Sequence, residues 1–140
     1  MPGHHEARPA TRAARLLVVD DNPDNLEIVT VLLGQKYDVY GYGSAAEALD
    51  ALDTVRPGLL VLDIRMRGVD GLQCLQAIRA RPGYAGIPAV ALTAFARDVE
   101  QKAFLDAGFQ AVVTKPILDD RELLGTIEHL LAAPVLSAAS

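Results

Sequence analysis

The chain has a single cysteine, no long apolar run and no cluster of basic residues, and each absence excludes a class of protein. Cys74 has no partner for an internal disulfide, which is compatible with a reducing compartment. No apolar stretch approaches the roughly 20 residues that a membrane-spanning helix needs. Residues 1–14 contain arginines but lack the apolar segment of a secretory signal. We therefore expect a cytoplasmic protein with no membrane association.

The charge balance argues against nucleic acid as a direct partner. The formal net charge is −5, and no run of lysine and arginine supplies the basic face that binds a phosphate backbone. Of the 140 residues, 51% are hydrophobic and 22% are charged. This composition predicts one globular domain that is long enough to bury a sizeable core.

Apolar segments and segments of helical periodicity alternate along the chain. Strands are predicted at 15–20, 37–42, 59–63, 88–93 and 111–114, where short apolar runs are bounded by turn residues. Helices are predicted at 22–34, 44–57, 71–82, 96–107 and 119–131. Such alternation is typical of an α/β fold with a doubly wound, five-stranded parallel sheet, (βα)5. Right-handed crossovers, and a crevice that needs the first and third strands as neighbours, favour the strand order 2-1-3-4-5.

These segments assign residues 15–131 to one domain. Residues 1–14 and 132–140 show no periodicity, and we expect them to form a flexible extension and a flexible tail. Two helix starts have clear capping signals. Asn22 precedes Pro23, which suits the first helical position, and Ser44 with Glu47 predicts a capping box.

Acidic residues stand at the ends of two predicted strands. Asp20 and Asp21 close the run LLVVDD, and Asp63 closes GLLVLD. Thr93 and Lys115 hold the corresponding positions at the ends of the fourth and fifth strands. In a parallel sheet these ends share one edge, where open α/β sheets bind their ligands. Three carboxylates that converge there repel one another, and a hard cation, for which we expect Mg²⁺, relieves the repulsion.

The chain resembles the receiver domain of two-component response regulators over residues 15–131. The segments that carry the resemblance are VVDDNPDN, LLVLDIRMRGVDG, AVALTAFA and VVTKPI. The resemblance implies a flavodoxin-like fold and a bacterial-type signalling domain of a phosphorelay. It also implies that the chain is no enzyme beyond its own phosphorylation and dephosphorylation.

The same resemblance implies a role for each member of the acidic cluster. Asp63 would be the phosphoacceptor, which forms an aspartyl phosphate. Asp21, Asp63 and the backbone carbonyl of Arg65 would ligate Mg²⁺ directly, and Asp20 would hold the ion through water. These roles agree with phosphoryl transfer, which needs an in-line nucleophile, a metal and fixed positive charge.

Two further residues are implied to contact the phosphoryl group. Lys115 would supply a cation, and Thr93 a hydroxyl donor that swings toward the new oxygens. Many receivers carry an aromatic residue three positions before the lysine, whereas this chain has Val112. Because valine cannot make a large ring movement, we expect the loop after Thr93, with Phe95 as a candidate, to respond instead.

The expected partners are proteins. The resemblance implies a sensor histidine kinase or a histidine phosphotransfer protein as the phosphodonor, and a downstream protein as the target. We expect a single-domain response regulator, as a monomer or a weak homodimer, because too few residues follow the last helix for an output domain. A receiver module excised from a hybrid histidine kinase is the nearest alternative.

Two other classes of function fit the same type of fold. A Mg²⁺-dependent phosphatase with an aspartyl nucleophile would place that nucleophile after the first strand, with a second carboxylate two residues later. In this chain Asp20 and Asp21 are adjacent. A flavin or nucleotide site would need a phosphate-cradling loop there, but Asp21 makes that loop acidic.

Overall fold

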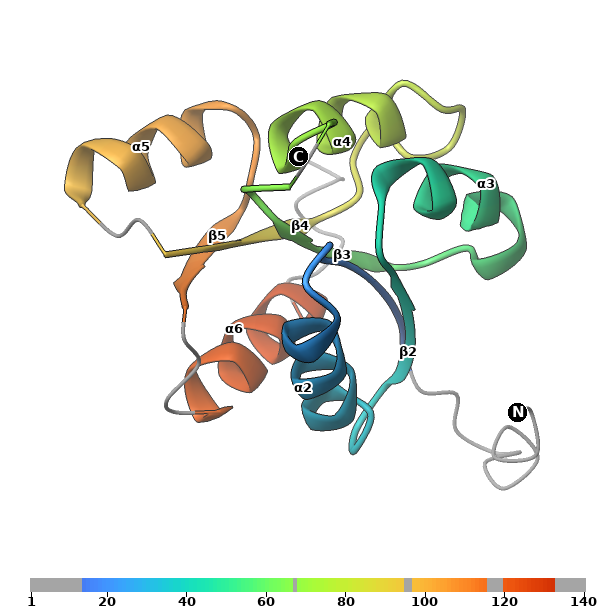
Figure 1. Ribbon diagram of the computed structural model, residues 1–140, viewed down its shortest axis with the longest axis horizontal. Helices are drawn as coiled ribbons and strands as arrows, with labels where there is room; N and C mark the ends of the chain where they lie inside the picture. Colours follow the sequence, from blue (N-terminus) through green and yellow to red (C-terminus); the bar gives the residue numbers. More distant parts are fainter. Residues whose placement is uncertain (1–13, 67, 95–96, 116–119, 133–140) are drawn as a thin grey trace.

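The computed structural model describes residues 14–66, 68–94, 97–115 and 120–132 (Figure 1). Within these ranges the strands are β1 (Arg15–Val19), β2 (Asp38–Tyr42), β3 (Leu59–Asp63), β4 (Ala89–Thr93) and β5 (Ala111–Thr114). The helices are α2 (Pro23–Leu33), α3 (Ala45–Val55), α4 (Gly71–Arg79), α5 (Asp98–Asp106) and α6 (Asp120–Ala132). The sheet is parallel throughout, with the order β2-β1-β3-β4-β5. The predicted fold class and strand order are confirmed.

Helices cover both faces of the sheet (Figure 1). Helices α2 and α6 lie on one face, and α3, α4 and α5 lie on the other. Each face has its own apolar core, and alternate residues of each strand contribute to one or the other. Every residue of β3 and β4 is therefore buried. Burial on both faces explains why these strands are continuous apolar runs rather than alternating patterns.

The helix starts show which capping signals the chain uses. The side-chain oxygen of Asn22 accepts the backbone N–H of Asn25 at 3.0 Å, and Pro23 opens α2 as predicted. The predicted capping box at Ser44 forms only in part. Ser44 Oγ accepts the N–H of Glu47 at 3.2 Å, but the Glu47 carboxylate accepts the N–H of Gly43 instead of that of Ser44.

Several boundaries differ from the prediction by one to three residues, as expected where helices and strands fray. Strand β1 ends at Val19, so Asp20 follows it, although the N–H of Asp20 still donates to the carbonyl of Tyr42 at 3.1 Å. Helix α4 ends at Arg79, before the predicted stop, and α5 begins at Asp98. The predicted terminal extension and tail lie almost wholly outside the described residues. Within the described residues, no helix has the length and apolarity to cross a membrane.

Helix α4 begins in close contact with the end of β3. A Cβ atom on Gly71 would lie 2.4 Å from the carbonyl oxygen of Asp63 and 2.9 Å from Cα of Ile64. The N–H of Gly71 donates to the carbonyl of Ile64 at 3.0 Å. Since the clashing atoms belong to the backbone, no side-chain rotation can relieve them. Glycine at this position therefore lets the start of α4 approach the residue that ends β3.

Gly71→Ala is expected to lower the free energy of unfolding by about 1–3 kcal/mol, because the added methyl group overpacks this contact. Urea denaturation at neutral pH measures the change. Gly125→Ala in α6 is the matched control, since a Cβ there meets nothing within 4 Å. That control should stabilise the protein by about 0.5–1 kcal/mol through helix propensity. Equal effects of the two substitutions would contradict this account.

Candidate functional site

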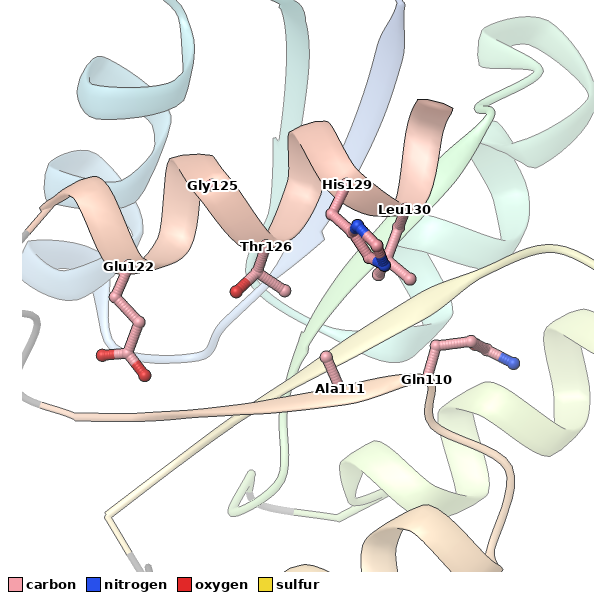
Figure 2. A pocket seen from close by; sticks show the side chains of 7 residues that line it. All are labelled: Gln110, Ala111, Glu122, Gly125, Thr126, His129 and Leu130. Atoms are coloured by element: carbon pink, nitrogen blue, oxygen red, sulfur yellow. The ribbon is translucent and has the colours of Figure 1, made fainter. Parts of the chain in front are cut away.

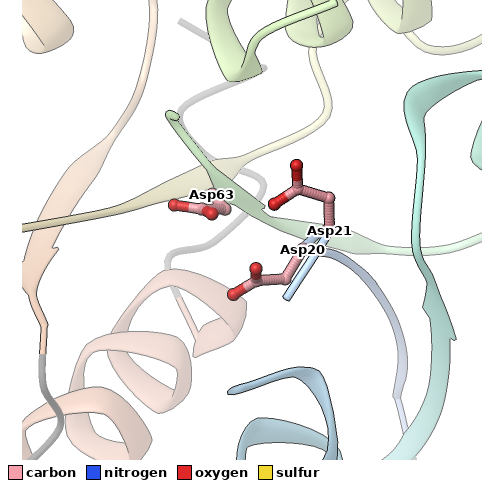
Figure 3. A group of neighbouring side chains, drawn as sticks. All are labelled: Asp20, Asp21 and Asp63. Atoms are coloured by element: carbon pink, nitrogen blue, oxygen red, sulfur yellow. The ribbon is translucent and has the colours of Figure 1, made fainter. Parts of the chain in front are cut away.

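The carboxyl edge of the sheet brings together residues that are far apart in the sequence. Asp20 and Asp21 follow β1, and Asp63 is the last residue of its neighbour β3. Figure 3 shows the three carboxylates gathered at this edge. One carboxylate oxygen from each residue lies within 4.8 Å of the others. The sequence placed these residues at one edge, and the structure places them in one cluster.

Lys115 reaches the cluster from the end of β5. Its Nζ donates to Asp63 Oδ1 at 3.1 Å and lies 3.7 Å from Asp20 Oδ2. Its backbone N–H donates to the carbonyl of Thr93 at 2.8 Å, which joins the ends of β5 and β4. The ammonium group therefore lies between two carboxylates, one directly after β1 and one at the end of β3.

Asp20 is completely buried, and its carboxylate is held from the start of α2. The backbone N–H of Asn22 donates to Asp20 Oδ1 at 2.9 Å. The side-chain amide of Asn25 donates to Asp20 Oδ2. Both oxygens thus have a protein donor, as a buried carboxylate requires. Asn25 was not among the predicted site residues, although its position five residues after Asp20, in the first turn of a predicted helix, was an available signal.

The environment of Asp63 disfavours its ionised form. The pKa of Asp63 is raised from 3.8 to about 6, because burial, followed by the nearby Asp20 carboxylate, raises it more than Lys115 lowers it. Asp63 is 3% exposed. A carboxylate in such surroundings is stabilised by any additional positive charge that reaches it. A cation bound at this site would therefore stabilise the ionised form of Asp63.

The donor set fits a hard divalent cation. Carboxylate oxygens are the ligands that Mg²⁺ prefers, and Asp21 is only half-buried, which leaves one side of the cluster open to water. Among the described residues, no other group of three or more His, Cys, Asp or Glu side chains could hold a metal. The cluster of Asp20, Asp21 and Asp63 could therefore bind a metal ion.

The structure also places the remaining predicted residues. Thr93 is buried at the end of β4, and Arg65 is exposed two residues after Asp63. Val112 is half-buried and packs against the core on the α3 side of the sheet. Phe95, the predicted alternative to an aromatic at position 112, lies outside the described residues.

A separate hollow of about 450 Å³ lies between β5 and α6 (Figure 2). Its lining residues are Gln110, Ala111, Glu122, Gly125, Thr126, His129 and Leu130. One carboxylate and one imidazole on an exposed helix face do not form a cluster like that at the sheet edge. The hollow is thus distinct from the candidate site.

Comparisons with known proteins agree with this geometry. The sequence model described as the response regulator receiver domain matches residues 16–128. A 14.6 kDa protein of Leptolyngbya boryana, described as uncharacterized, is 36% identical over 121 residues, which cover 85% of this chain and 92% of that protein. The sensor histidine kinase GacS of Pseudomonas protegens is 41% identical over 121 residues, which cover 81% of this chain but 13% of the kinase.

A solved structure supports the same relationship. The crystal structure of a response regulator from Desulfuromonas acetoxidans superposes with a TM-score of 0.75 at 27% identity. The match covers 84% of this chain and 96% of that chain.

The raised pKa of Asp63 predicts a pH-dependent stability in metal-free buffer. Between pH 3.8 and about 6 the folded protein holds more protons on Asp63 than the unfolded chain does. The contribution of Asp63 to the free energy of unfolding therefore falls as the pH rises through this window, and is constant above it. Asp63→Asn should remove this dependence. It should exceed the wild type in stability above the window by on the order of 1–3 kcal/mol.

Urea denaturation at several pH values, with a chelator present, measures this difference. Asp50→Asn is the control, because Asp50 is an exposed carboxylate on α3. Its stability profile should run parallel to that of the wild type. The prediction is wrong if Asp63→Asn gains no stability relative to the wild type as the pH rises.

Proposed function

Since the chain belongs to the response regulator receiver domain family, we propose that it accepts a phosphoryl group on Asp63 and thereby switches its contacts with other proteins. The phosphodonor would be a phosphohistidine of a sensor histidine kinase or of a histidine phosphotransfer protein. The observation that carries the proposal is the buried Asp63 carboxylate, with Lys115 Nζ at 3.1 Å and two more carboxylates beside it.

The transfer would be a displacement at phosphorus. A carboxylate oxygen of Asp63 attacks the phosphorus atom, the new P–O bond forms as the P–N bond to the imidazole breaks, and the leaving imidazole takes up a proton from solvent. Such reactions are accelerated by positioning and by positive charge on the equatorial oxygens rather than by covalent chemistry. Lys115 would supply part of that charge, since it already lies within hydrogen-bond distance of Asp63.

We propose Mg²⁺ as the cation of the site. Asp21, Asp63 and the backbone carbonyl of Arg65 would hold it directly, and Asp20 would contact it through water. When bound, Mg²⁺ would neutralise the carboxylates and the incoming phosphoryl oxygens. The support is the spacing of the three carboxylates, together with the burial that makes an ionised Asp63 unfavourable without added positive charge.

The response to phosphorylation would begin at Thr93 and Lys115. Phosphorylation adds about one to two negative charges beside these two groups. The Thr93 hydroxyl and the Lys115 ammonium would move toward those charges. The movement would shift the packing of β5 and of the helices beside it, α5 and α6. The change would be a shift in the populations of two packing arrangements. The size of the shift depends on how much more favourably the phosphoryl group interacts with one arrangement than with the other.

We propose that the chain acts as a single-domain response regulator. The 92% coverage of the Leptolyngbya boryana protein supports this form. The 41% identity to a 13% portion of GacS favours the second candidate, a receiver module of a larger histidine kinase. Immunodetection of the protein in its native cells distinguishes the two, because the second candidate requires a product several times larger than this chain.

Incubation with a small phosphodonor and Mg²⁺ is expected to add one phosphoryl group to the protein. The adduct should be stable in acid and labile in base, as an acyl phosphate is, and intact-mass measurement detects it. Asp63→Asn and a chelator should each abolish the adduct. Asp50→Asn, which makes the same chemical change at an exposed site, should leave it intact. A phosphoryl group that persists in Asp63→Asn would refute the assignment of the acceptor.

Lys115→Ala is expected to impair the response more than the acceptance of the phosphoryl group, because bound metal still neutralises Asp63. In the wild type, a fluoroberyllate mimic should shift the amide NMR signals of β5 and α6. In Lys115→Ala these shifts should largely disappear while the phosphoryl adduct still forms. Lys102→Ala removes an exposed lysine paired with Asp106 and should behave as the wild type. Undiminished shifts in Lys115→Ala would contradict the role of the lysine.

A further inference from the structure

We propose that Asn25 is a positioning residue of the acidic cluster. Its side-chain amide fixes the orientation of the Asp20 carboxylate beside the proposed Mg²⁺ site, and it keeps Asp20 from competing with Asp63 for Lys115. The inference rests on the proposed function and deepens it. It adds to the site a residue of α2 that ends the segment VVDDNPDN but had no predicted role.

Both carboxylate oxygens of Asp20 are held by donors at the start of α2. Its two carboxylate oxygens receive separate donors from the start of α2, the backbone N–H of Asn22 on Oδ1 and the Asn25 amide on Oδ2. Asp20 has no exposed surface, so bulk water cannot replace either donor. Losing a partner of a buried carboxylate leaves that oxygen unsatisfied. The orientation of Asp20 therefore depends on Asn25.

The ammonium group of Lys115 lies near both Asp20 and Asp63. Lys115 Nζ lies 3.7 Å from Asp20 Oδ2, the same oxygen that the Asn25 amide contacts, and 3.1 Å from Asp63 Oδ1. The amide satisfies Oδ2 while the ammonium group stays closer to Asp63. Without the amide, the ammonium is the nearest charged donor that could satisfy Oδ2. Asn25 thus biases Lys115 toward the phosphoacceptor.

The first turn of α2 explains why the amide can hold this position. The backbone N–H of Asn25 donates to the side-chain oxygen of Asn22, the N-cap residue, at 3.0 Å. The residue is therefore fixed at its backbone by a helix cap and at its side chain by Asp20. Groups that orient a carboxylate near a metal in this way typically change metal affinity by about 10–100-fold when they are lost.

Calorimetric titration with Mg²⁺ alone tests the proposal. Asn25→Leu has a similar size but no donor, and its dissociation constant for Mg²⁺ should be about tenfold or more above that of the wild type. Asn25→Gln keeps the amide on a longer side chain and should recover part of the affinity. Asn25→Ala should weaken Mg²⁺ binding as the leucine variant does. Because alanine favours the helix, this variant replaces Asn25→Leu in the test if Asn25→Leu fails to fold. Ser44→Ala removes the cap of α3 and should leave the dissociation constant unchanged.

A kinetic measurement separates positioning from a general loss of structure. With a small phosphodonor, the Mg²⁺ concentration for half-maximal phosphorylation should rise in Asn25→Leu by the same factor as the dissociation constant. The rate at saturating Mg²⁺ should fall by a smaller factor. A dissociation constant within about twofold of the wild type in a folded Asn25→Leu or Asn25→Ala would overturn the inference alone. Absence of Mg²⁺ binding or of phosphorylation in the wild type would instead overturn the proposed function, and this inference with it.

Discussion

The repulsion between buried carboxylates at the end of the sheet is the constraint on which the rest of the site depends. Asp20 and Asp63 are buried side by side because β1 and β3 are neighbours, and the ammonium of Lys115 opposes their charges. Burying ionised groups in this way costs free energy unless charge and hydrogen bonds compensate for it. The raised pKa of Asp63 shows that the compensation is incomplete. A bound cation would neutralise the remaining negative charge of the carboxylates, and a phosphoryl group on Asp63 would change the charge balance of the site.

The fold supplies rigid supports for this unfavourable cluster. The apolar strands are covered by helices on both faces, so their ends are held in register while their last side chains reach the edge of the sheet (Figure 1). Helix α2 contributes donors from its first turn to Asp20, and α4 packs against the backbone of Asp63 through Gly71. Because the supports belong to regular elements rather than to long loops, the charged groups cannot easily separate to reduce their repulsion.

The accuracy of the sequence-based predictions varied with the range of the interactions involved. Strands β3 and β5 match their predicted bounds, because short apolar runs between turn residues depend on local composition. The cap at Asn22 was also predictable. The capping box at Ser44 was only partly correct, and the complete box between Asp70 and Gln73 was not predicted. Several N–H groups near a helix start compete for one side chain, and small backbone differences decide among them.

The sequence by itself determined the order of strands and helices, the doubly wound parallel sheet, and the set of acidic, hydroxyl and amine side chains at its carboxyl edge. These features follow from periodicity and from the handedness of crossovers, which act on any chain with this pattern. The tertiary structure alone decided that Lys115 lies closer to Asp63 than to Asp20, that burial raises the pKa of Asp63, and that Asn25 contacts Asp20. The contacts of Lys115 and the desolvation of Asp63 depend on packing between distant segments, which no local pattern encodes. The contact of Asn25 with Asp20 spans five residues, but it depends on how the start of α2 folds back toward the end of β1.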